Sequence, residues 1–435
     1  MHHPMKLRDF VAISNGRPLE LLFKVHSVMP AVPLPHQLVA LMKFWKSLSI
    51  LLTSVDSLEW PSFVTYAFRR FIIFASALQA HLDSRLVLHV MPPLDVLWVW
   101  HSLLQSPAAC YASFAHNGFI QFLDVPFPLD RIGDCIDNQL FAYTPDALGV
   151  YNFTSIVRSF GFDLDYDIPL PLNPASIFYP VFSPVTGNQL GTVLLAQFVS
   201  PHMRFASGDT FVTHFSLTHL QTKADWNKKQ KIAELPQFLN LKESTGPGSL
   251  FTIASGFFNA LPLVHLTVGP HCVKLSGDWV SHALHNSVPL LVESLNWLFH
   301  GGLEKGLNEA IIRYKNFFEL MSKGGHDQRV PTLDIRLVWS AHMSNFKQYA
   351  DFSIYWAKCV VVPAADGVQT TSCLFRTAKR FAELFGRSYC QCKCKYCFQY
   401  GGQNVSDSVQ EHSFSCARYI YDLLLPVICE GDEAV

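Results

Sequence analysis

The pattern of apolar residues changes twice along the chain, from helical to strand-like and back to helical. Residues 37–52 and 63–82 are apolar runs of helical length with few helix-breaking residues, and they predict two helices. In residues 308–322 the apolar positions follow the 3.6-residue period of an amphipathic helix: Ile311, Tyr314, Phe317, Phe318 and Met321. Residues 166–300 instead contain short Val-, Phe- and Thr-rich runs separated by turn residues, which is typical of short strands. We therefore expect an α+β fold, mainly α, in which helical units flank a central region of short β-strands.

One motif occurs twice, about 240 residues apart. The first copy begins at Pro92 and reads Pro-Pro-Leu-Asp-Val-Leu-Trp-Val-Trp-His; the second begins at Pro331 and reads Pro-Thr-Leu-Asp-Ile-Arg-Leu-Val-Trp-Ser. In each copy a Trp follows the Asp by five residues, and a Tyr comes ten or eleven residues after that Trp. An apolar segment that contains Arg precedes each copy, at residues 68–71 and 311–314. This much agreement predicts a duplicated helical unit.

The two copies and the change of composition between them divide the chain into three expected regions. Residues 1–165 form an N-terminal helical unit with the first copy, and residues 166–300 form the central strand-rich region. Residues 301–435 form a C-terminal helical unit with the second copy and a cluster of cysteines.

The aspartates of the motif are candidates for acid/base or metal chemistry, with histidines as partners. His101 follows Asp95 by six residues and His342 follows Asp334 by eight. On a helix these spacings turn the side chains about 120° and about 80° apart, so neither pair converges on one side of its own helix. An Asp after Pro-x-Leu and before an apolar run is also a favoured helix N-cap. We expect the N-cap role, and keep as the alternative a site formed between the two copies by all four residues.

The strongest chemical signal lies near the C-terminal end of the sequence. Its candidate metal ligands are Cys390, Cys392, Cys394, Cys397, His412 and Cys416. The order Cys394-x2-Cys397, a gap of fourteen residues, then His412-x3-Cys416 is close to the spacing of a structural zinc site. The four cysteines of residues 390–397 offer a competing ligand set, and a group of reduced thiols without metal is the other interpretation. Zinc is therefore an expected cofactor of this segment.

The composition narrows the class of protein. With 49% hydrophobic and 15% charged residues, the chain is expected to be globular with a large core. Its 33 basic residues balance 34 acidic ones, which argues against nonspecific attraction to nucleic acid or anionic membranes. Residues 168–203 and 245–273 lack charges, but Pro, Gly and polar residues break them, which suits buried strands better than membrane spans. Eleven cysteines clustered late in the sequence, without an apolar signal segment at the start, indicate a reducing, cytoplasmic setting.

The motif resembles the signature of the glycine-rich-domain-containing protein family of plants and fungi. Members of that family typically read Leu-Asp-x4-Trp-His-x-His, followed by Ser-Pro and a Tyr. The first copy here keeps much of this pattern, at Trp100, His101, Ser106, Pro107 and Tyr111, but has Leu103 at the second His position. The second copy has Ser340 at the first His position and keeps His342. The chain thus resembles a divergent, fungal-type member that lacks the glycine-rich tail, and residues 179–182 replace the Cys-Pro-x-Cys pair of the family's middle region.

The family's domain has no known function, so the resemblance implies kinship and leaves the activity open. From the scarcity of catalytic motifs we expect a noncatalytic binding or scaffold protein with a protein partner, no membrane association and no nucleic acid. The alternative is a metal- or thiol-dependent enzyme whose site lies between the two copies. A second alternative, suggested by RNA-linked relatives in plants, is an RNA-associated protein, although the chain carries no RNA-recognition signature or basic patch.

Overall fold

A computed structural model describes the parts of the chain on which the following account rests. These are residues 5–6, 30–55, 59–82, 89–168, 178–182, 188–198, 205–207, 210–212, 263–268, 271–275, 280, 296–299, 303–323, 329–357, 359–361, 371–387 and 389.

The N-terminal unit is built around a helix that is buried on almost every side. Its elements are α2 (Pro35–Ser54), α3 (Trp60–Gln79), α4 (Leu94–Leu104), α5 (Pro107–His116), η3 (Ile120–Asp124), α6 (Leu129–Asp134) and α7 (Ala147–Ser159). The central helix is α3, which packs against both α4 and α7. Pro35 and Pro61 stand in the first turns of α2 and α3, where the missing backbone N–H costs no helical hydrogen bond. Asp146 caps α7 by accepting a hydrogen bond from the Gly149 N–H.

In the C-terminal unit, as in the N-terminal unit, a long helix is followed by two shorter helices. It contains η7 (Asn296–Phe299), α14 (Leu303–Lys323), α15 (Leu333–Met343), α16 (Phe346–Ala357), β8 (Cys359–Val360) and α17 (Thr371–Phe385). The helices predicted at residues 37–52 and 308–322 lie inside α2 and α14, so the apolar pattern located both. The helix predicted at 63–82 begins earlier, at Trp60, and ends at Gln79. Strand β1 (Met5–Lys6) pairs antiparallel with β8.

The described strands of the central region form a small antiparallel sheet. Its order is β3-β2-β6-β7, with bounds β2 (Tyr179–Phe182), β3 (Gln189–Val193), β6 (Leu263–Val268) and β7 (His271–Leu275). A separate hairpin joins β4 (Phe205–Ser207) to β5 (Thr210–Val212). The fold is therefore α+β and mainly α, as the sequence predicted. Among the described helices, none combines the length and the apolar character needed to cross a membrane.

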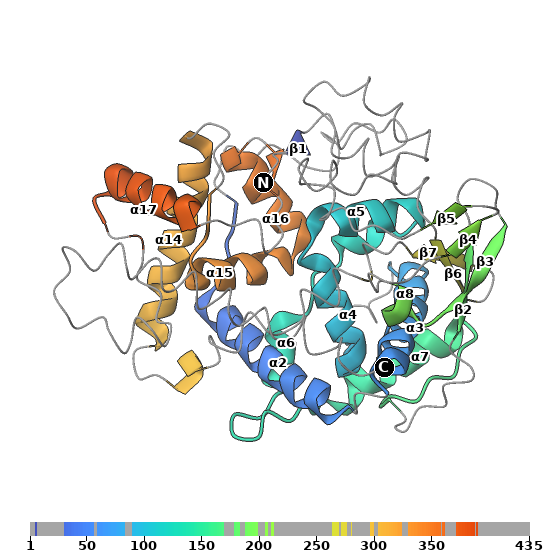
Figure 1. The fold of residues 1–435 in the computed structure, drawn as a ribbon. Helices are drawn as coiled ribbons and strands as arrows, with labels where there is room; N and C mark the ends of the chain where they lie inside the picture. The colour runs from blue at the N-terminus through green and yellow to red at the C-terminus, as the bar shows by residue number, and fades with distance from the viewer. Residues whose placement is uncertain are drawn as a thin grey trace.

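The sheet lies beside the N-terminal unit in space. Helix α3 contacts β6 and the short helix α8 (Leu195–Phe198), and Figure 1 shows the sheet on the side of α3 away from α14. The Asn117 side-chain amide fastens the sheet by donating to the Lys274 carbonyl at 3.0 Å and accepting from the Lys274 N–H at 2.8 Å. The strand-rich region is thus central in the sequence but does not separate the two helical units.

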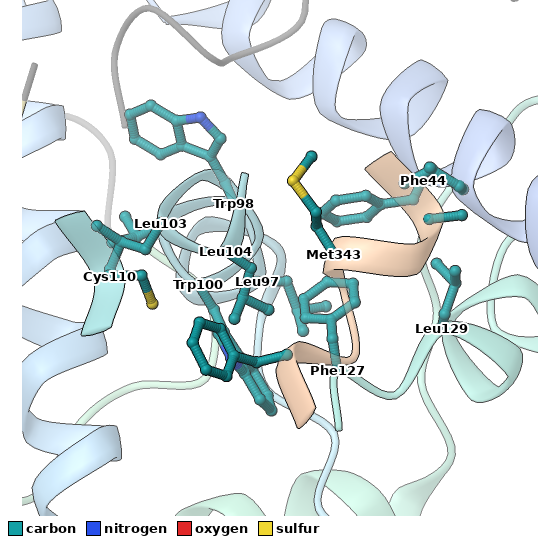
Figure 2. Close-up of a cluster of buried hydrophobic side chains, with 14 of the residues drawn as sticks. Phe44, Leu97, Trp98, Trp100, Leu103, Leu104, Cys110, Phe127, Leu129 and Met343 are labelled. Atoms are coloured by element: carbon teal, nitrogen blue, oxygen red, sulfur yellow. The ribbon is translucent and has the colours of Figure 1, made fainter. Parts of the chain in front are cut away.

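The two helical units pack directly on each other. Helix α2 runs between them and contacts α6 of one unit and α14 and α15 of the other (Figure 1). Figure 2 shows Met343 of α15 among apolar side chains of the N-terminal unit, including Phe44 and Phe127. The Phe127 N–H donates to the Ser344 carbonyl at 3.0 Å, so a backbone hydrogen bond also joins the two units. One continuous apolar core therefore runs through both units.

Candidate functional site

A buried ion pair joins the two central helices of the N-terminal unit. Arg70 of α3 donates through Nε to Asp95 Oδ2 of α4 at 2.7 Å, and both side chains are almost fully buried, with 0% and 3% exposed. The two terminal nitrogens of Arg70 donate to the carbonyls of Asp165 at 2.7 Å and Tyr166 at 2.6 Å. Burial raises the pKa of the Asp95 carboxyl, and the neighbouring Arg70 charge opposes that shift. One guanidinium thus holds α3, α4 and the segment after α7 together.

The C-terminal unit has the same arrangement. Arg313 of α14 forms an ion pair with Asp334 of α15, and these side chains are 8% and 5% exposed. The Thr332 hydroxyl donates to Asp334 Oδ1 at 2.7 Å. In both units, therefore, an Asp at the second position of an eleven-residue helix meets an Arg from the long helix before it.

The expected N-cap role of the two aspartates is wrong. The N-cap residues are Pro93 for α4 and Thr332 for α15, and neither makes a side-chain capping bond. A buried guanidinium needs a counter-charge, and each aspartate supplies one to the Arg of the long helix before it. The signal that could have revealed the pair was the Arg in the apolar segment before each copy of the motif.

The tryptophans of the two copies are both buried, as predicted, with 2% of each exposed. The Trp339 Nε1–H donates to the Tyr349 hydroxyl at 2.9 Å, and that hydroxyl donates to the Val361 carbonyl. Within the described residues, by contrast, no group accepts a hydrogen bond from Trp100 Nε1. Tyr111 follows Trp100 by eleven residues and stacks on Phe346 of the other unit, with ring centroids 6.4 Å apart.

The difference between the two tryptophans follows from their spacing to the next Tyr. Tyr349 comes ten residues after Trp339, whereas Tyr111 comes eleven after Trp100. One extra residue turns a helical side chain by about 100°, which is enough to aim it at another neighbour. The first copy therefore keeps the buried Trp but lacks the internal hydrogen-bond acceptor.

The two candidate histidines are buried among aromatic rings. His101 lies 5.4 Å from Phe44 and 5.4 Å from Phe127 between ring centroids. His342 Nδ1 and the Tyr314 hydroxyl share a hydrogen bond 2.9 Å long. Burial lowers the pKa of each histidine from its ordinary 6.5 to about 3, so both rings are neutral at physiological pH.

The structure gives the four sequence-based site candidates separate partners. Asp95 and Asp334 each pair with an Arg, His342 faces Tyr314, and His101 Nε2 lies 3.2 Å from the Gln105 amide nitrogen. That Gln105 nitrogen also donates to the Ser340 carbonyl at 3.2 Å, which ties α4 to α15. In the part of the chain that the structure describes, no group of three or more His, Cys, Asp and Glu residues could hold a metal ion. The six predicted zinc ligands between Cys390 and Cys416 lie outside the described residues.

A cleft of about 850 Å³ opens between the two units. Its walls come from α2, the C-terminal end of α3, Trp100 of α4, residues 121–131 and the α15–α16 junction. Its volume falls in the usual range of ligand sites, about 300–1,000 Å³. Sequence reasoning did not find this cleft, because its walls come from segments far apart along the chain.

The charged residues on the cleft walls are paired within the protein. Asp124 lies 3.4 Å from Lys347 Nζ. Asp130 lies 3.1 Å from His36 Nε2 and accepts from the Gln37 amide at 3.1 Å. Arg131 donates to Asp146, which is 3.0 Å away.

Two buried polar atoms in residues lining the cleft have no partner among the described residues. They are the donor Trp100 Nε1 and the acceptor Gln79 Oε1. The Gln79 Nε2 group donates to Gln121 Oε1 at 2.8 Å. The amide nitrogen of Gln79 is therefore held in place, while its oxygen has no hydrogen-bond donor among the described residues. Buried polar groups usually have partners, and two such atoms in one cleft mark it as a candidate ligand site.

Replacing Asp95 by Asn should destabilise the protein by about 3–5 kcal/mol, because it leaves the Arg70 charge buried without a counter-ion. Urea unfolding of Asp95→Asn, Arg70→Met and the double variant measures this. The double variant should lose less stability than the sum of the single variants. Asp163→Asn is the matched control, since Asp163 pairs with Arg158 at 2.9 Å on the surface and should contribute no more than about 1 kcal/mol. A cost for Asp95→Asn no larger than that for Asp163→Asn would show that the Asp95 carboxylate is not needed to balance the Arg70 charge.

Lowering the pH from 6.5 towards 3 should reduce the free energy of unfolding, because the unfolded chain protonates His101 and His342 while the folded chain does not. Each histidine contributes a slope of about 1.4 kcal/mol per pH unit in that window. His101→Phe should remove one such increment from the slope. Equal slopes for His101→Phe and the parent protein would show that His101 is not kept neutral by burial.

Comparison with known proteins adds one match. The family model described as glycine-rich domain-containing protein-like matches residues 300–351. This segment contains α14 and α15, and with them Arg313, Asp334 and Trp339. No curated protein and no solved structure matches the chain. The long helix with its buried Arg and the Leu-Asp helix that follows it are thus the part of this fold in which the similarity to the glycine-rich domain-containing protein-like family is recognised.

Proposed function

We propose that this protein is a noncatalytic binding protein that holds its ligand in the cleft between its two helical units. The observation that carries the proposal is the pair of buried polar atoms without partners, Trp100 Nε1 and Gln79 Oε1, in residues that line one cleft. A bound ligand that satisfies both atoms would remove the cost of burying them alone.

The state of the candidate acid/base residues supports binding over catalysis. Asp95 and Asp334 serve as counter-ions for buried arginines, which fixes their carboxylates inside the units. His101 and His342, with pKa values of about 3, are weak bases at neutral pH, whereas a general base works best with a pKa near the working pH. The residues that the motif repeats therefore suit a rigid scaffold better than proton transfer.

We further propose that the two helical units are copies of one ancestral unit. In each, a long helix carries a buried Arg, and the next helix has eleven residues with Asp second and Trp seventh. The copies have diverged where they meet: Gln105 of one reaches the Ser340 carbonyl of the other, and the cleft forms from unlike surfaces. A duplicated scaffold with a site at the junction is consistent with a binding role.

The setting and partner remain proposals from composition. The balanced charge and the eleven cysteines suit a cytoplasmic protein with a protein partner and argue against nucleic-acid binding.

Ligand screening of the purified protein tests the cleft. Ligand-observed NMR with separate sets of neutral, acidic and basic small molecules and short peptides should reveal saturable binding. Gln121→Trp should weaken that binding at least tenfold, because Gln121 is an exposed residue of the cleft wall and an indole there fills the space. Gln139→Trp is the matched control, at an exposed position away from the cleft, and should bind as the parent does. If no ligand of any set depends on Gln121, the proposed function is wrong.

Zinc binding by the C-terminal cysteines is a separate proposal that rests on their spacing alone. Elemental analysis of protein purified under reducing conditions should find about one zinc per chain, lowered by Cys397→Ser. Less than roughly a tenth of a zinc per chain would favour plain thiols.

A further inference from the structure

We propose that the ligand of the cleft is an uncharged, extended peptide segment of a partner protein, whose main chain bonds to Trp100 and to the side-chain amides of the cleft. The inference rests on the proposed function and adds to it the class of ligand. It is argued from the charge, the hydrogen-bonding capacity and the apolar surface of the walls.

The charges of the cleft argue for a neutral ligand. Asp124 and Arg131 already have ion-pair partners at 3.4 and 3.0 Å, and Asp130 accepts a hydrogen bond from the Gln37 amide at 3.1 Å. A charged ligand would have to compete with these partners for the same charged groups. A ligand without net charge avoids that competition.

The unpartnered atoms argue for a group that both accepts and donates. Trp100 Nε1 is a donor only, and Gln79 Oε1 is an acceptor only. A peptide unit carries one carbonyl acceptor and one N–H donor, so an extended chain can satisfy both atoms. The exposed Gln121, fixed to Gln79 at 2.8 Å, adds a second amide at the rim.

The protein already contains an example of this recognition. The Asn117 amide binds both the carbonyl and the N–H of Lys274, at 3.0 and 2.8 Å. A side-chain amide there takes the place of a neighbouring strand. Gln79 and Gln121 offer the same chemical group on the cleft wall.

The apolar part of the walls gives the side chains of such a segment a place to pack. Phe74, Leu78 and Phe127 line the cleft, together with Pro126 and Pro128. Main-chain hydrogen bonds combined with pockets for alternate side chains are the usual means of binding extended peptides. This surface suits small and medium apolar side chains.

The equivalent tryptophan of the C-terminal unit differs from Trp100 in its hydrogen bonding. Trp339, at the equivalent place in the motif, has its indole N–H bonded to Tyr349, so it has no donor to offer. In the first unit, where the spacing to Tyr111 is one residue longer, the Trp100 donor has no partner among the described residues, and the Trp100 side chain lines the cleft. The same residue type is therefore a packing residue in one unit and a recognition residue in the other.

The test uses the full chain labelled with ¹⁵N-tryptophan. The indole N–H resonances of Trp100 and Trp339 are assigned with Trp100→Phe and Trp339→Phe. The probes are N-acetylated, C-amidated pentapeptides of Ala, Leu, Val, Pro and Gln, the same lengths containing Asp or Lys, and neutral oligosaccharides. The uncharged peptides should shift the Trp100 resonance in a saturable way and leave Trp339 unmoved.

Variants separate recognition from folding. Trp100→Phe keeps an aromatic ring and removes the donor, and Gln79→Leu removes the acceptor at a half-buried position. Each variant should weaken peptide binding about tenfold with an unchanged circular dichroism spectrum.

If the cleft binds only charged peptides or oligosaccharides in a Gln121-dependent way, the peptide proposal is overturned and the binding function stands. If peptides bind without moving the Trp100 resonance, the assigned recognition residue is wrong. If no probe of any class binds, the proposed function fails with it.

Discussion

The guanidinium of Arg70 lies out of contact with water and binds three parts of the N-terminal unit at once: the Asp95 carboxylate of α4 and the backbone carbonyls of Asp165 and Tyr166. Burying a charge costs several kcal/mol per ion, and that cost is offset only when the geometry supplies close partners. This requirement fixes how α3 meets α4, since another register between the helices would leave the guanidinium unpaired. Arg313 and Asp334 impose the same constraint on α14 and α15.

We expect such pairs to contribute more to the uniqueness of the packing than to its net stability. Apolar side chains around them, including Phe74 and Trp100 in one unit and Phe318 and Trp339 in the other, supply the buried area. Apolar surface alone tolerates several alignments of two helices, because the hydrophobic effect is not directional. A single buried Arg and a single buried Asp accept only one. Their place in both copies of the motif accounts for an Asp on a helix that is otherwise strongly apolar.

The junction between the two helical units is not built around a buried ion pair among the described residues. Among the described residues, the polar contacts there include the Gln105 amide on the Ser340 carbonyl and the Phe127 N–H on the Ser344 carbonyl. Apolar packing around Met343 closes one part of the junction (Figure 2), and the cleft occupies another. A partly open junction between two packed units is a common place for ligand sites. The change from ten to eleven residues between Trp and Tyr is such a variation.

The sequence by itself determined the mainly helical α+β class, the helices at residues 37–52 and 308–322, and the burial of Trp100 and Trp339. These follow from periodicity and residue type, which report which face of a segment leaves water. Tertiary structure alone decided the partner of each buried polar group: Arg70 for Asp95, 25 residues away, and Tyr314 for His342, 28 residues away. It also placed the sheet beside α3 and gathered the cleft from residues as distant as Gln37 and Gln348. Periodicity states that a face is buried, whereas the neighbour that covers it is chosen by the packing of the whole chain, because a buried charge or donor must find its partner across helices.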